Sequence, residues 1–250
     1  MTENNENAEN KLNTENTENA ENNLNTENTT AETETAFTAE ASADAKNLAG
    51  EAKDYLKNAD LKKEAAEAKG FFIAMAKEPI GTIKNVAQTP DKAFPVAIAS
   101  LAIWVVFNFL RHSLNAILGS GSFILGLMAI ITRTISPIVL VAVVAIAAYM
   151  MLGKKEKGIR SFVILVAVAS FPRALTSVVQ VLPTLLPFAS IVSVPVNYLL
   201  NGIYWLLIFF GLKTMADETV DESFFLPFIK VMIIYVVARI VLQPLGIMPL

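Results

Sequence analysis

The feature that most constrains this chain is a series of five long apolar segments that follow residue 93. A membrane-spanning helix needs about 20 consecutive apolar residues, and lipid offers no partner for a bare peptide group, so each segment is predicted to be an α-helix. The predicted fold class is all-α: a polytopic transmembrane bundle of about five spans over residues 93–250. The predicted spans are Phe94–Leu110, Ile135–Leu152, Phe162–Leu182, Ile191–Leu212 and Phe224–Ile247.

One further apolar run, Phe123–Ile131, is too short to cross a bilayer alone. It is predicted to be a re-entrant or interfacial piece, or an extension of the second span.

The first 42 residues have the composition of a disordered tail. Residues 1–40 contain ten Glu, no Asp and one Lys, whereas the rest of the chain holds 19 Lys and Arg against 13 Asp and Glu. The tail repeats Asn, Thr and Glu, with almost no apolar side chains to bury on folding, so it is predicted to stay disordered. It is interpreted either as a solvated spacer or as an acidic segment that binds a basic partner.

Residues 43–92 are predicted to form cytoplasmic amphipathic and juxtamembrane helices. Ala52 and Tyr55 belong to a weakly apolar face that suits a partner helix as well as a membrane. Pro79 is placed at the start of a second helix, on which Ile80, Ile83 and Ala87 share a face that is predicted to lie in the lipid headgroups. Thr89 is predicted to cap the helix that follows.

Basic residues in the short connections predict the orientation. Lys77, Lys84 and Lys92 precede the first span, and four basic residues lie between the second and third. The positive-inside rule then places the N-terminus in the cytoplasm and the C-terminus outside. Arg111 and Arg133 are assigned to the outer loop, where they weaken this contrast without reversing it.

Arg173 is the most informative single residue, because it lies near the middle of the third span. A charge at that depth is costly and marks a functional-site hypothesis. The predicted spans contain no Asp or Glu to pair with it. Its candidate partners are therefore backbone carbonyls, water, a lipid phosphate or the neutral side chains Gln180, Asn197 and Asn201. The alternative is an arginine that snorkels in a kinked helix.

Two further polar groups interrupt the apolar spans. Asn197, Asn201 and Tyr204 fall on one face of the fourth span. They are interpreted either as interhelical contacts or as part of a substrate path. Arg239 and Gln243 form a similar pair on the fifth span, nearer the outer surface, where Arg239 is predicted to snorkel.

The composition disfavours most enzymes. The chain has no Cys and one His, His112, so thiolate chemistry and sites built from several histidines are excluded within one chain. The run Gly119–Ser122 near His112 is interpreted as a turn rather than as the nucleophile loop of a membrane protease. We expect no enzymatic activity, no cofactor, no metal site and no nucleic-acid partner.

The arrangement resembles the Yip family of Rab-interacting five-helix membrane proteins, and specifically its prokaryotic branch. The resemblance covers about Phe71–Ile247 and is carried by Glu78-Pro79-Ile80-Gly81-Thr82-Ile83 with Thr89-Pro90, by the five-span topology, and by the unit Tyr204–Lys213 before the last helix. It implies a non-enzymatic protein that organises partners or shapes the bilayer. Relatives of this kind often carry an N-terminal zinc ribbon, whereas this chain has the acidic tail instead.

Two functions follow as hypotheses. The first is a scaffold or adaptor of the bacterial cytoplasmic membrane, with membrane lipids and a cytoplasmic or membrane protein as partners. The second is a transporter or lipid-handling protein with a site for an anion or lipid headgroup at Arg173. The identity of the protein partner and the oligomeric state are left open.

Overall fold

The computed structural model describes residues 43, 46–47, 49–55, 57, 61–118, 123–152, 157–216 and 222–243. Within these residues the secondary structure is helical and contains no strand, in agreement with the predicted all-α class. The chain divides into two compact units, Met1–Glu51 and Ala52–Leu250. The described residues of the first unit are helical and exposed, and the predicted disordered tail lies outside the described residues.

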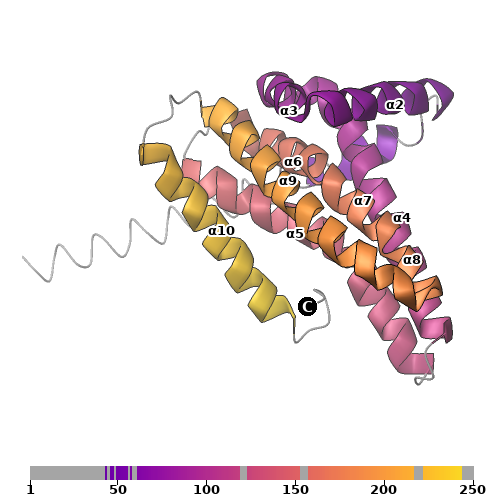
Figure 1. Cartoon of the computed structure of the whole chain (residues 1–250). Helices are drawn as coiled ribbons and strands as arrows, with labels where there is room; N and C mark the ends of the chain where they lie inside the picture. Colours follow the sequence, from indigo (N-terminus) through magenta and orange to yellow (C-terminus); the bar gives the residue numbers. More distant parts are fainter. Residues whose placement is uncertain are drawn as a thin grey trace, which may run out of the picture. The chain divides into compact units, whose positions relative to one another are not determined.

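Five helical stretches of the second unit are long and apolar enough to cross a membrane, as predicted. The chain is therefore an integral membrane protein. The first two are α4 (Phe94–Leu118), which follows the short 3-10 helix Pro90–Ala93, and α5 (Phe123–Leu152). The third consists of α6 (Gly158–Ala169), α7 (Phe171–Val179) and α8 (Val181–Leu185), and the last two are α9 (Ser190–Ala216) and α10 (Glu222–Leu242). Figure 1 shows these helices as a bundle in which successive spans alternate in direction.

The boundaries of the first two spans differ from the prediction. The first does not stop at Arg111 and His112, because α4 continues to Leu118 with His112 buried inside the bundle. Of the three alternatives predicted for Phe123–Ile131, the extension of the second span is confirmed, since this run forms the first part of the continuous helix α5. Arg111 and Arg133 therefore lie within helices and not in an outer loop.

The third span is interrupted twice, at Ser170 and at Gln180. Pro172 stands in the first turn of α7, where its missing N–H does not break a helical hydrogen bond. The backbone continues in nearly helical form, with Ser170 donating to Val166 and accepting from Ala174. Arg173 is thus held at the start of a short helix, about midway along the span.

Two N-terminal helices pack on the spans. These are α2 (Leu61–Lys77) and α3 (Pro79–Gln88), and α3 begins at Pro79 as predicted. Ile83 and Ala87 are fully buried, and α3 packs mainly on α9. Two of the three residues that were predicted to lie in the headgroups are therefore covered by protein, mainly by α9, whereas the third, Ile80, is exposed. Thr89 does not cap the next helix with its side chain, since its hydroxyl donates to Asn85 O.

The bundle consequently has two distinguishable ends. The proximal end carries α2 and α3 and is where α9 finishes, and Figure 1 shows these two helices lying across it. Phe72 of α2 stacks on Phe171, near the middle of the third span, with ring centroids 4.2 Å apart. The distal end is where α4 finishes and α9 begins. The last predicted span was expected to reach Ile247, and α10 ends at Leu242.

Candidate functional site

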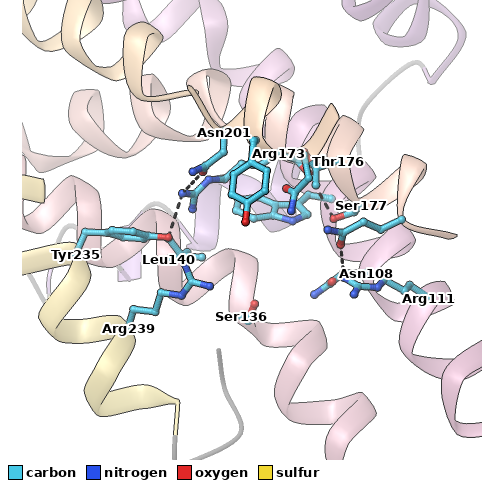
Figure 2. Close-up of a pocket in the computed structure, with 14 residues that line it drawn as sticks. Asn108, Arg111, Ser136, Leu140, Arg173, Thr176, Ser177, Asn201, Tyr235 and Arg239 are labelled. Carbon is cyan, nitrogen blue, oxygen red and sulfur yellow. Dashed lines mark hydrogen bonds between the residues drawn. The ribbon is translucent and has the colours of Figure 1, made fainter. Parts of the chain in front are cut away.

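Arg173 is buried, with 8% of its surface exposed, and it does not snorkel to water. Its Nη2 donates to Asn201 Oδ1 at 2.8 Å and to the Tyr235 hydroxyl at 3.0 Å. Asn201 was predicted as a partner and Tyr235 was not. Figure 2 shows the guanidinium between α9 and α10, pointing to both partners.

Aromatic rings surround the same guanidinium. Its central carbon lies 3.9 Å from the ring centroid of Tyr204, 5.1 Å from that of Tyr235 and 5.9 Å from that of Trp205. Tyr204 is fully buried beneath it. A cation over ring faces is stabilised most where water is excluded, so rings and neutral dipoles, rather than a carboxylate, hold this charge.

A second arginine lies on the other side of α7. The Arg111 guanidinium on α4 donates to Gln180 Oε1 at the end of α7. One turn before Arg111, Asn108 Nδ2 donates to the backbone carbonyl of Arg133 on α5. Gln180 was one of the candidate partners of Arg173, and in the structure its side-chain oxygen accepts from Arg111 on α4.

These groups line one pocket of about 410 Å³ between α4, α5, α7, α9 and α10. Figure 2 shows Arg111, Arg173 and Arg239, each from a different span, around this space. Among the residues described, none that lines the pocket is Asp or Glu. The lining residues are Trp104, Asn108, Arg111, Ser136, Leu140, Arg173, Thr176, Ser177, Gln180, Asn197, Tyr198, Asn201, Tyr235 and Arg239.

Five of the six predicted site residues line this pocket: Arg173, Gln180, Asn197, Asn201 and Arg239. The sixth, Tyr204, supports Arg173 from below through its ring. Arg239 was predicted to snorkel outward. In the structure it is one of the residues that line the pocket inside the bundle.

The residues that the sequence reasoning missed have a recognisable spacing. Thr176 and Ser177 follow Arg173 by three and four positions, so they share one helix face with it and with the predicted Gln180. Asn108 and Arg111 on α4 show the same three-residue spacing. A count of the polar residues at helical period along each span would have grouped these residues. The predicted first span ended at Leu110, however, and so left Arg111 out.

The described residues contain no group of three or more His, Cys, Asp or Glu that could hold a metal ion. His112 is buried, and its Nε2 has no hydrogen-bond partner in the described structure. The Gly-Ser run that was compared with a protease loop lies outside the described residues. The pocket lining presents hydrogen-bond donors and positively charged arginines, and these groups suit the binding of an anion.

No family model, no curated protein and no solved structure matches this chain.

Proposed function

We propose that this protein binds a phosphate-bearing anion inside the membrane and acts as a lipid-handling or transport protein. The observation that carries the proposal is the convergence of Arg111, Arg173 and Arg239 on one pocket without an acidic lining residue among those described. The positive charges of Arg111 and Arg173, both in the pocket lining, attract an anion that enters it.

The chemistry of arginine favours phosphate over a simple halide. A guanidinium presents five donors in a planar fork that matches the oxygens of phosphate or carboxylate. Asn197 and Ser136 add neutral polar groups to the lining, and such groups can complete the hydrogen bonds of a tetrahedral ligand.

The distribution of lysines supports an orientation for this site. Lys77, Lys84 and Lys92 are at the proximal end, which we propose lies in the cytoplasm, with the C-terminus outside a bacterial cytoplasmic membrane. The pocket extends from the middle of the third span toward the distal end, where Arg111 and Arg239 lie. In this orientation it occupies the outer half of the bilayer.

A Yip-like scaffold is the second candidate, and it rests on a different observation. Both α2 and α3 pack on the spans, with Phe72 stacked on Phe171, so a cytoplasmic partner bound to the N-terminal region has a firm attachment to the bundle. Deletion of residues 1–60 separates the two roles. A scaffold loses its partner in this variant, whereas anion binding by the pocket is retained.

Intrinsic fluorescence provides the direct test of anion binding. The chain has two tryptophans: Trp104 lines the pocket and Trp205 lies beside Arg173. Inorganic phosphate titrated into the purified full chain in detergent should change the emission saturably. Arg173→Leu should weaken binding by about ten- to a hundredfold, as expected for a lost charged hydrogen bond.

Two further variants make the result decisive. Arg111→Gln removes a pocket charge without touching the Arg173 hydrogen bonds and should also weaken binding. Arg160→Leu is the control, because Arg160 belongs to the same span as Arg173 but pairs with Asp91 outside the pocket. The absence of a saturable change, or equal binding by all variants, would contradict the proposal.

A further inference from the structure

We infer that the ligand of the pocket is a lipid that enters sideways between α9 and α10, with its phosphate on the arginines and its acyl chains left in the bilayer. This inference rests on the proposed anion site and adds the source of the anion and its route. It follows from how α9 and α10 meet, from where the pocket reaches the surface, and from the chemistry of the surface beside it.

The two helices contact each other through aromatic side chains near the proximal end. Phe209 of α9 packs its ring against Phe224 and Phe228 of α10 at 5.5 and 5.1 Å, and Trp205 packs on Tyr235 at 5.0 Å. In the described structure, the ring contacts between α9 and α10 end at Tyr235. Figure 1 shows α9 and α10 diverging toward the C-terminal end of α10.

The pocket lies where the helices separate. Asn197, Tyr198 and Asn201 line it from α9, and Tyr235 and Arg239 line it from α10. Tyr198 is 75% exposed, so the lining of the pocket continues onto the outer surface of α9. The site is therefore accessible from the side of the bundle and not only from its end.

The surface on both sides of this opening is apolar. Ile191 and Val194 are exposed on α9, and Val237 and Ile240 are exposed on α10. In an integral membrane protein such faces are covered by acyl chains. A charged pocket beside an acyl-covered surface matches an amphiphile with an anionic head, whereas a free anion that took the same lateral route would have to cross that apolar margin without its hydration shell.

Brominated lipids test the route, because bromine on an acyl chain quenches tryptophan fluorescence at contact. The full chain is placed in phosphatidylcholine nanodiscs that contain a small fraction of either brominated phosphatidylglycerol or brominated phosphatidylcholine. We expect at least twofold stronger quenching by the anionic probe at equal fraction. Arg173→Leu should remove this difference, and Arg160→Leu should retain it.

A variant of the opening separates the route from the anion site. Val194→Phe places a larger side chain beside the opening on α9, outside the pocket lining, so it should lower the selective quenching while inorganic phosphate still binds in detergent. If phosphate binds but the two brominated lipids quench equally, the lipid inference is wrong and the anion site stands. If phosphate does not bind and quenching is not selective, both proposals fail.

Discussion

Arg173 shows how a buried cation can be kept without a counter-charge. An isolated charge in a medium of low polarity costs many kcal/mol, and here the cost is offset by Asn201, the Tyr235 hydroxyl and the face of Tyr204. These partners are neutral, so the net charge of the site remains positive. A carboxylate at any of these positions would have neutralised the site and removed its affinity for an anion.

The Tyr235 hydroxyl is the partner whose contribution can be isolated. Tyr235→Phe keeps the ring beside Arg173 and removes the acceptor at 3.0 Å. We expect unfolding in detergent to become easier by about 1–3 kcal/mol, the usual effect of removing a hydrogen bond to a charged group. Thermal denaturation followed by circular dichroism measures this.

Tyr198→Phe is the matched control for that change. Tyr198 also lines the pocket, but it is 75% exposed, and Arg173 donates to Asn201 and Tyr235 instead. Loss of the Tyr198 hydroxyl should leave the melting temperature within about a degree of that of the unsubstituted protein. Equal effects of the two substitutions would mean that the hydroxyl of Tyr235 does not stabilise the buried guanidinium.

At this scale the sequence identified the central residue but not its surroundings. The depth of Arg173 and the lack of intramembrane acids are visible in the sequence, and so is Asn201 as a partner. Tyr235 was not identified because it lies 62 residues away, and only tertiary packing brings α10 to α7. The pairing of Gln180 with Arg111 was not identified for the same reason.

Among the glycines of the described structure, Gly211 on α9 makes the closest approach to a neighbouring helix, α6. A Cβ placed on Gly211 would lie 2.8 Å from Leu165 Cδ1 and 3.1 Å from Cδ2, and Leu165 is fully buried. The leucine has little room to withdraw. Contacts between small residues and a neighbouring helix are a common means of joining transmembrane helices.

Gly211→Ala should therefore separate α9 from α6 and destabilise the bundle by about 1–3 kcal/mol, the usual cost of overpacking. Gly202→Ala on the same helix is the control, because a Cβ there has nothing within 4 Å. It should be neutral or slightly stabilising through helix propensity. Denaturation of both variants in mixed micelles compares them, and equal stabilities would contradict this packing.

Hydropathy predicted the existence of the five spans, but it did not predict where charged residues would be accommodated inside them. The Arg111-His112 pair is typical of a helix end at a membrane surface. In the fold, α4 continues for about two more turns because Gln180 accepts a hydrogen bond from Arg111 and neighbouring helices bury His112. Neither condition can be inferred from the sequence around Arg111.

For the whole molecule, five spans require that the two ends of the chain lie on opposite sides of the membrane. The chain contains no Cys, so single cysteines introduced into it are unique labels. In intact cells, a membrane-impermeant maleimide should label Leu186→Cys at the distal end. It should reach Lys77→Cys and Lys157→Cys only after permeabilisation.

The labelling pattern has two informative failures. If the cysteines at 77 and 157 label from opposite sides, α4 and α5 do not both cross the bilayer. If the labelling of all three cysteines is reversed, the five spans are supported but the proposed cytoplasmic position of the N-terminus is wrong. The pocket then lies in the inner leaflet.

The wide separation of the partners of Arg173 along the chain has a consequence for biosynthesis. Asn201 follows it by 28 residues and Tyr235 by 62. Because the ribosome delivers helices in order, the third span enters the bilayer before α9 and α10 can bring these partners to it. Its charge must be tolerated by the insertion machinery until the last helix arrives, so the newly made protein completes its assembly only when translation is nearly finished.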